Sequence, residues 1–108
     1  MKSVLDRERI YQWLSQEIAS WQAISAYVFG SILDLENNSP SDVDLYVCYE
    51  SEKISEIIQL KISIQKRFLA EFGLELHILL LTEQESDESG DFLRKALSAS
   101  RCIKQLNF

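Results

Sequence analysis

The sequence has few of the features that mark a secreted or membrane-inserted protein. Only two of its 108 residues are cysteines, Cys48 and Cys102, and they stand far apart. Its first residues, MKSVLDRERIYQW, carry charges throughout and lack the apolar segment of a secretory signal. No apolar run approaches the ~20 residues that a membrane span needs. We therefore expect a cytoplasmic protein, away from membranes, whose two thiols are reduced rather than joined in a disulfide.

Basic residues are also scarce relative to acidic ones. The chain has 11 Lys and Arg against 17 Asp and Glu, which gives a net charge of −6. A nonspecific nucleic-acid-binding protein is usually basic because it must neutralise phosphates, so we do not expect nonspecific nucleic-acid binding. The charge balance does not exclude a nucleotide or a protein partner.

The sequence does have the material for one hydrophobic core. Hydrophobic residues make up 46% of the chain and aromatic residues 10%, which argues against disorder. A chain of this length forms one compact domain, and no repeat or low-complexity tract divides it. We therefore predict a single domain over residues 1–108.

The most informative stretch is VFGSILDLENNSPSDVDLYV, residues 28–47. A short apolar segment stops at Gly30, which is typical of a strand that ends in a tight turn. Glycine allows backbone N–H groups to come close to a ligand, and Ser31 adds a hydroxyl at the start of a short helix. This combination suits an anion such as phosphate.

The second half of the stretch alternates between polar and apolar residues. Val43, Leu45 and Val47 share one face of a predicted strand, and Asp42 and Asp44 share the other. From the rise of a strand, the two aspartates are roughly 6.5–7 Å apart at Cβ. Two carboxylates on one face can hold hard divalent cations, Mg²⁺ above all. A phosphate-binding turn facing such a strand is the layout for phosphoryl or nucleotidyl transfer.

Each motif alone has a simpler interpretation. An isolated Asp-x-Asp is usually a solvated strand edge, and an isolated Gly-Ser is usually only a turn. The ordered set of strand, Gly-Ser, short helix, loop and Ser-Asp-x-Asp-Leu is much less expected by chance.

Together, Gly30-Ser31 and Ser41-Asp42-Val43-Asp44-Leu45 resemble the signature of the nucleotidyltransferase superfamily that includes DNA polymerase β. The similarity is greatest to its minimal bacterial nucleotidyltransferase branch, and the flanking elements extend it over most of the chain. Family members commonly continue after Gly-Ser with small and basic residues, and this chain has Ile32-Leu33-Asp34-Leu35 instead.

The resemblance implies transfer of a nucleoside monophosphate from an NTP, expected to be ATP, to a hydroxyl acceptor. It implies that Asp42 and Asp44 bind two Mg²⁺ ions and that Gly30 and Ser31 hold the β- and γ-phosphates. Members of this branch often pair with a small helical protein of the HEPN type in toxin–antitoxin modules. The resemblance therefore also implies an antitoxin with a HEPN-type partner.

The residues outside this stretch predict an α/β fold with a mixed sheet of three to four strands packed against helices. We expect helices at 3–19, capped by Ser3, at 51–72, capped by Ser51 and ended by Gly73, and at 91–99. Strands are expected at 24–29, 41–49 and 74–81, with a short edge strand at 102–106. We expect a short helix within 30–36 and loops at 37–41 and 82–91, the second of them acidic and mobile.

The apolar strand LELHILLL at 74–81 is expected to be central in the sheet. The resemblance implies a third acidic residue on it, and Glu75 matches best by position and type, as a metal ligand or a proton acceptor. His77, the sole histidine, shares the face of Glu75. We interpret it as a buried, hydrogen-bonded side chain, with a role in the site as the alternative.

A second function stays open beside catalysis. A protein that keeps this fold but does little chemistry would act by contact with a partner. Asp34 in place of a basic residue and the acidic surface favour this alternative, whereas the retained carboxylates and Gly30-Ser31 favour catalysis.

Overall fold

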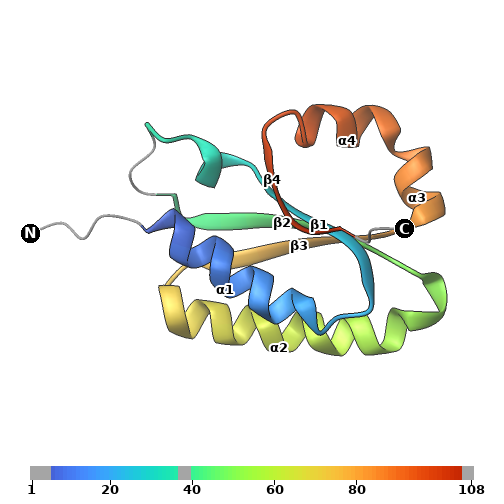
Figure 1. Ribbon diagram of the computed structural model, residues 1–108, viewed down its shortest axis with the longest axis horizontal. Helices are drawn as coiled ribbons and strands as arrows, with labels where there is room; N and C mark the ends of the chain where they lie inside the picture. Colours follow the sequence, from blue (N-terminus) through green and yellow to red (C-terminus); the bar gives the residue numbers. More distant parts are fainter. Residues whose placement is uncertain (1–5, 37–39, 106–108) are drawn as a thin grey trace, which may run out of the picture.

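The computed structural model describes residues 6–36 and 40–105 and forms an α/β domain (Figure 1). Its helices are α1 (Arg7–Ala19), α2 (Ile54–Phe72), α3 (Glu83–Glu88) and α4 (Gly90–Ala96), with two short 3₁₀ turns, η1 (Ser31–Leu33) and η2 (Ser51–Lys53). Its strands are β1 (Ala23–Phe29), β2 (Asp42–Tyr49), β3 (Glu75–Thr82) and β4 (Ser100–Gln105).

The four strands form one mixed sheet in the order β3-β2-β1-β4. Strand β1 is antiparallel to both β2 and β4, whereas β2 and β3 are parallel and are joined through α2. The predicted α/β class and mixed sheet are confirmed, and so is the edge position of the last strand. The prediction that the third strand is central was wrong, because β3 is the other edge.

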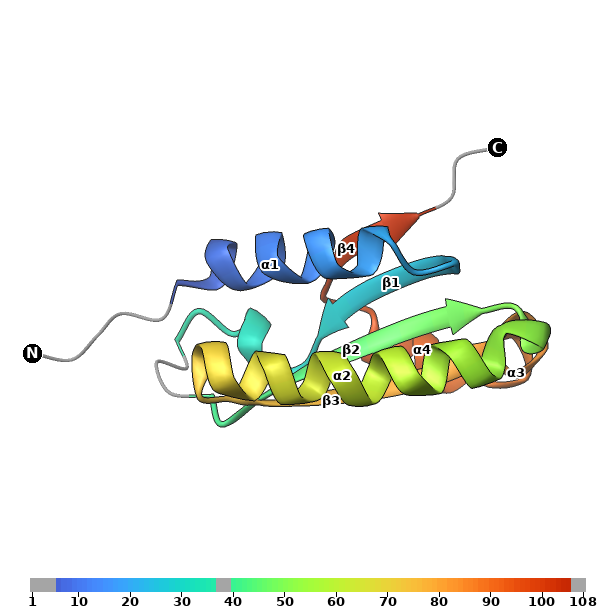
Figure 2. The same ribbon diagram turned by 90° about the horizontal axis from the view of Figure 1, so that it is seen from below.

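Helices α1 and α2 lie on one face of the sheet, and α3 and α4 lie on the other (Figures 1 and 2). The two long helices meet through aromatic rings: Trp13 of α1 packs edge-on against Phe68 and Phe72 of α2. Between them and the sheet lies the core, whose fully buried side chains include Ile10, Leu14, Ile18, Val28, Ile32, Val43, Leu45, Val47, Ile57, Ile64 and Phe68.

The helix ends differ in part from the predicted caps. Ser3 lies outside the described residues, and the cap of α1 is Asp6, whose carboxylate accepts a hydrogen bond from the Arg9 N–H. Ser51 begins the 3₁₀ turn η2 rather than capping α2, which starts at Ile54. Gly73 ends α2 in the left-handed conformation, with φ +69°, as predicted.

The acidic stretch after β3 is helical rather than the mobile loop that its composition predicted. Thr82 and Glu85 form a reciprocal capping box, in which each side chain accepts a hydrogen bond from the backbone N–H of the other. This pair satisfies N–H groups at the start of α3. No helix in the described part of the chain is long and apolar enough to cross a membrane.

Candidate active site

The turn after β1 has a conformation that only glycine adopts easily. Gly30 has φ +85° and ψ −155°, in the region that side chains disfavour. The next residues form η1, with hydrogen bonds from the Leu33 N–H to the Gly30 carbonyl and from the Asp34 N–H to the Ser31 carbonyl. Ile32 is fully buried in the core and anchors the turn, while Ser31 is exposed.

Asp42 and Asp44 lie on the face of β2 opposite the core, as the alternation predicted. Their side chains are 33% and 31% exposed, whereas Val43 and Leu45 between and beside them are fully buried. Asp44 pairs across the sheet with Phe29, the residue before Gly30. This register places the second aspartate directly beside the glycine turn.

The contact between Asp44 and Gly30 is close. A Cβ added to Gly30 would lie under 3.0 Å from Oδ2 of Asp44 and 3.3 Å from its Cγ. The missing side chain of Gly30 is therefore the space that the carboxylate occupies. The two motifs read from the sequence form one packed unit.

The carboxylate of Asp44 is less acidic than an ordinary aspartate. Partial burial raises its pKa, and the nearby charge of Asp42 raises it further, while His77 acts in the opposite direction. Two carboxylates held together in this way are a place where a cation would relieve repulsion.

Strand β3 brings Glu75 and His77 to the same end of the sheet. In the parallel register, Glu75 pairs with Asp42 and His77 pairs with Asp44. The prediction of a buried histidine was wrong, since His77 is 54% exposed. Its Nδ1 lies 3.6 Å from Oδ2 of Asp42 and 3.6 Å from Oδ1 of Asp44, and its Nε2 lies 3.2 Å from Oε2 of Glu75. Glu75 is 71% exposed and reaches this group through His77.

A basic residue does approach the turn, but from a distant part of the sequence. Arg7 of α1 donates hydrogen bonds to the carbonyls of Ile32 and Asp34, the latter at 2.9 Å. The Asp34 carboxylate accepts a hydrogen bond from the Glu36 N–H at 3.0 Å, a contact within its own loop. Sequence reasoning missed Arg7, because no local motif links it to a turn that lies 25 residues away.

Beyond the aspartates, the same face of β2 is closed by α3. The Tyr46 hydroxyl lies 2.6 Å from the Ser86 hydroxyl, and Ser86 also contacts the thiol of Cys48 at 3.7 Å. Burial raises the pKa of Tyr46 to about 12, so its phenol stays protonated. The Tyr46 ring stacks on Tyr27 at 6.3 Å between centroids. The open part of the face is therefore the end that carries Asp42 and Asp44.

With this geometry in place, the family can be assigned. A family model described as "Polymerase beta, Nucleotidyltransferase" matches residues 9–107. The chain belongs to this nucleotidyltransferase family. No curated protein matches the chain at a significant level.

A solved structure gives the same result for the fold. The chain is similar to a mutant of the toxin–antitoxin MntA–HpeT, with a TM-score of 0.52 and 13% sequence identity. The match covers 95% of this chain and 75% of that chain. At this identity the likeness supports the nucleotidyltransferase fold alone.

Nucleotidyltransferases of this family typically use divalent metals, and the donors present here fit such an ion. Asp42 and Asp44 offer carboxylate oxygens, which Mg²⁺ prefers, and Asp44 is seated in the space beside Gly30. Within residues 6–36 and 40–105, however, no three His, Cys, Asp or Glu side chains already surround one metal position. The aspartate pair alone is therefore the candidate for binding a divalent cation.

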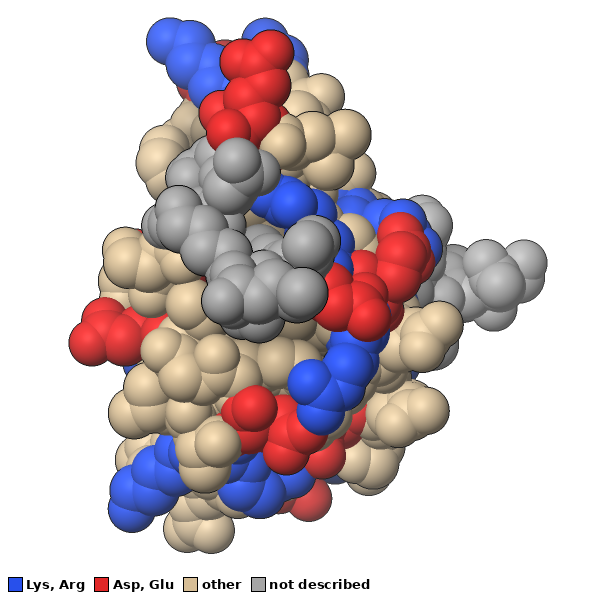
Figure 3. Space-filling view, turned by 90° about the vertical axis from the view of Figure 1, so that its left-hand side faces the viewer, with Lys and Arg blue, Asp and Glu red and all other residues tan. Residues whose placement is uncertain are grey.

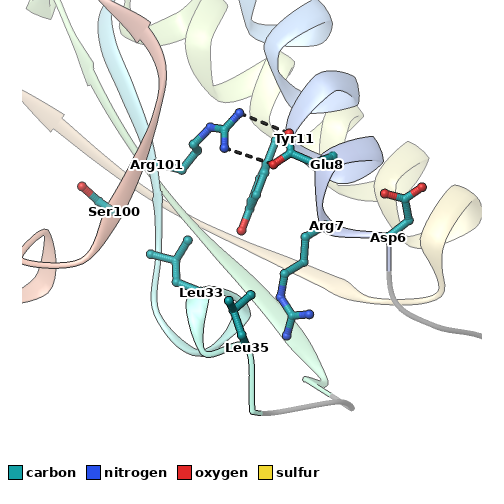
Figure 4. A pocket seen from close by; sticks show the side chains of 8 residues that line it. All are labelled: Asp6, Arg7, Glu8, Tyr11, Leu33, Leu35, Ser100 and Arg101. Atoms are coloured by element: carbon teal, nitrogen blue, oxygen red, sulfur yellow. Dashed lines mark hydrogen bonds and ion pairs between the residues drawn. The ribbon is translucent and has the colours of Figure 1, made fainter.

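A cavity of about 660 Å³ lies close to this site but is separate from it (Figure 4). It is bounded by the first turn of α1, the η1 region and the start of β4, and it includes none of the aspartates on β2. Arg101 pairs with Glu8 at 3.1 Å and lies over the ring of Tyr11. Arg7, the other arginine of the cavity, is bonded to η1. Since both arginines already bind groups of the protein, the cavity does not offer a preformed site for an anion.

Charges of both signs cover the end of the molecule that carries the first turn of α1. Basic and acidic side chains lie next to one another there, without a continuous basic patch on this face (Figure 3). Arg9 pairs with Glu71 and Arg67 with Glu17 across the two long helices.

Proposed function

We propose that the protein is a metal-dependent nucleotidyltransferase that moves a nucleoside monophosphate from an NTP, with ATP as the expected donor, to a hydroxyl acceptor. One observation carries this proposal: Asp42 and Asp44 share one open face, and Asp44 is packed against Gly30 of the Gly-Ser turn. This packing supports the proposal, because a single metal-bound triphosphate could touch both the aspartate pair and the turn.

Each part of the site has a role in this proposal. The turn at Gly30 and Ser31 binds the β- and γ-phosphates through its N–H groups and the exposed Ser31 hydroxyl. Asp42 and Asp44 hold Mg²⁺, which when bound lowers the pKa of the attacking hydroxyl and offsets charge on the leaving pyrophosphate. Arg7 fixes η1, so that the phosphate-binding turn keeps its shape.

The toxin–antitoxin complex MntA–HpeT supports this assignment by its aspartates. The matched structure is a double mutant in which two aspartates separated by a single residue are replaced by glutamate. Asp42 and Asp44 have the same spacing. We therefore propose that this chain is likewise the antitoxin of a pair, and that the partner is a helical protein of the HEPN type.

Helix α2 provides a surface for such a partner. Ile54, Ile58, Ile62 and Leu69 form an apolar stripe along the helix and are between 43% and 51% exposed. Such spacing is that of a helix face that packs against another helix. The buried residues of α2 are Ile57, Ile64 and Phe68, so the stripe is separate from the part of the helix that packs into the core.

The apolar stripe also favours a second candidate function, in which the protein neutralises its partner by contact alone. In that case the lack of basic residues at Ile32–Leu35 would reflect lost turnover, and the stripe would be the functional surface. The two candidates differ in whether a nucleotide is consumed.

Label transfer separates them. The protein is incubated with Mg²⁺ and a candidate HEPN-type partner, with ATP labelled at either the α- or the γ-phosphate. Nucleotidyl transfer predicts that the α-label becomes covalently attached to the partner while the γ-label leaves in pyrophosphate. Asp42→Asn should abolish attachment. Binding of the partner without any label transfer, at all nucleotides tried, would support the contact-only function instead.

The apolar stripe is tested separately. Ile58→Asp and Ile62→Asp should weaken partner binding at least tenfold, whereas Gln59→Glu, an exposed α2 position beside the stripe, should leave it unchanged. All three variants should bind Mg²⁺ and ATP like the wild type. Equal partner affinity in all of them would remove α2 as the docking surface.

A further inference from the structure

The outer side of β3 is an open edge of the sheet, because no other strand in the described part of the chain pairs with it. Glu75 shows which backbone groups face this side. Its N–H donates to the carbonyl of Ser41, on the side of β2, at 3.4 Å. Successive residues of a strand direct their N–H and C=O groups to opposite sides. The backbone groups of Ile78 and Leu80 therefore point outward.

Hydrogen bonds within the chain close this edge at both ends. The Leu76 carbonyl accepts a hydrogen bond from Nε2 of Gln65 at 2.9 Å, and the Thr82 N–H donates to the Glu85 carboxylate at 3.0 Å. Both groups are on the outward side. The part of the edge that stays open is the apolar segment ILLL, residues 78–81.

The two edges of the sheet differ in how they are protected. Natural edge strands usually carry charges, proline or bulges, which prevent another strand from adding. The strand β4 has two basic residues and a register shift against β1. Residues 78–81 of β3 are uncharged, lack proline and keep an unbroken register with β2. Strand β3 is therefore the edge that is open to pairing.

The apolar stripe of α2 lies beside this edge. Helix α2 packs mainly over β3 (Figure 2). Gln65, which reaches the outer side of β3, follows Ile58 by seven residues and Ile62 by three, so it shares their flank of the helix. The opposite flank faces α1, to which Arg67 is paired. The stripe and the open edge therefore form one continuous apolar surface.

We propose that this surface is the interface of a homodimer, in which β3 pairs antiparallel with β3 of a second copy about a two-fold axis at Leu79. In this register Ile78 of one copy lies opposite Leu80 of the other, and each such pair exchanges two hydrogen bonds. The outward N–H and C=O groups of both residues are then all satisfied in both copies. A two-fold interface requires such self-complementarity, which is why the occupant is a second copy of this chain.

The same axis brings the two apolar stripes together. Gln65 is bonded at the start of the open edge, and Leu79 is about 10 Å further along β3. This length equals about six or seven residues of helix, and α2 runs opposite to β3, so Ile58 lies nearest the axis. Ile54 of one copy then faces Ile62 of the other. Dimerisation would thus bury the exposed side chains of α2 together with the edge of β3.

This inference goes beyond the proposed function and does not depend on nucleotide transfer. It does affect how a partner binds. The second copy covers Ile58 and Ile62 in the free protein, so a helical partner that docks on the stripe must displace it. Self-association and partner binding therefore compete for one surface.

Sedimentation equilibrium on the full chain tests the dimer, with a reductant present so that the exposed Cys102 forms no disulfide. The mass of the wild type should rise with concentration from that of one chain to that of two. Leu79→Lys and Leu79→Glu should each raise the dissociation constant at least tenfold, because like charges meet across the axis. An equimolar mixture of the two variants should restore the dimer. Leu35→Lys, at a 76% exposed position outside the surface, should leave the dissociation constant unchanged.

Hydrogen exchange locates the interface. The Ile78 and Leu80 amides should exchange more slowly as the chain concentration rises, whereas those of Leu79 and Leu81, which face β2, should not respond. A chain that stays monomeric up to about 100 μM would overturn the proposal. So would a dimer that neither Leu79 variant weakens, or a mixture of the two folded variants that stays monomeric. None of these results alters the proposed nucleotidyl transfer, which the label-transfer experiment tests by itself.

Discussion

The carboxylate of Asp44 fills the space that a side chain on Gly30 would need: a Cβ there would lie under 3.0 Å from Oδ2. Two constraints therefore favour glycine at residue 30: its φ of +85°, and the Asp44 carboxylate, which leaves no room for a side chain. Because Asp44 is a proposed metal ligand, a change at residue 30 should alter both the stability of the fold and the site.

Gly30→Ala can be compared with Gly73→Ala to separate these two effects. Both glycines have positive φ, but nothing lies within 4 Å of a Cβ at Gly73. Alanine should cost about 1–2 kcal/mol of unfolding free energy at Gly73 from backbone strain alone, and clearly more at Gly30. Urea unfolding measures both values. Equal losses of unfolding free energy at the two positions would mean that the Asp44 side chain can move aside without destabilising the fold.

The raised pKa of Asp44 predicts a pH dependence of stability. Burial and the charge of Asp42 make the folded protein hold the Asp44 proton more tightly than the unfolded chain does. The contribution of this group to the unfolding free energy therefore falls as pH rises from about 4, its unfolded pKa, through the higher folded pKa.

Asp44→Asn removes this titration. The variant should be more stable than the wild type near pH 7, and the difference should shrink as pH is lowered through the raised folded pKa of Asp44 and level off below about 4. Asp87→Asn, at an exposed position of α3, serves as the control and should show no such trend. Thermal unfolding across this pH range is the measurement. A wild type that is the more stable of the two near neutral pH would show that Asp44 is held by favourable contacts instead.

Much of this arrangement could be predicted from the sequence, because the signals were local. The alternation at residues 42–47 placed both aspartates on one face, and Gly30 and Gly73 marked a turn and a helix end. Pairings between distant segments gave no such signal. Nothing near Arg7 indicates that it bonds to η1, and nothing near His77 indicates that it lies between two aspartates of another strand.

Each wrong prediction has its own physical cause. The apolar run of β3 predicted a central strand, but β3 lies at the sheet edge, where Leu76 is buried and its other hydrophobic residues are only partly covered. Composition predicted an acidic loop after β3, but Thr82 and Glu85 cap a helix there. On α2, hydrophobic spacing could not tell the buried stripe from the exposed one, since both follow helical periodicity.

Adjacent residues of α2 test that distinction. Phe68 is fully buried and contacts Trp13 and Phe72, whereas Leu69 is 51% exposed. Phe68→Ala should cost about 3–5 kcal/mol of unfolding free energy, because it leaves a cavity in the core. Leu69→Ala should change it by less than about 0.5 kcal/mol. A large loss at Leu69 would contradict its place on the exposed stripe.

Arg7 offers a prediction about the turn. Arg7→Gln removes charged hydrogen bonds to the carbonyls of Ile32 and Asp34 and should cost about 1–2 kcal/mol. Hydrogen exchange at the Leu33 and Asp34 amides should speed up. Arg9→Gln, which breaks an exposed pair with Glu71, should cost less than about 1 kcal/mol and leave those amides unchanged. Similar exchange in the two variants would show that Arg7 does not hold η1.

The central claim is that Asp42, Asp44 and the Gly30 turn form one site for a metal-bound nucleotide. Calorimetry of ATP binding, with and without Mg²⁺ or Mn²⁺, tests it on the wild type and on the double variant Asp42→Asn, Asp44→Asn. The account predicts metal-dependent binding by the wild type, none by the double variant, and a melting temperature that is unchanged or raised by the substitutions. Metal-dependent binding that survives in the folded double variant would contradict it. So would the absence of binding by the wild type, both alone and mixed with the proposed helical partner.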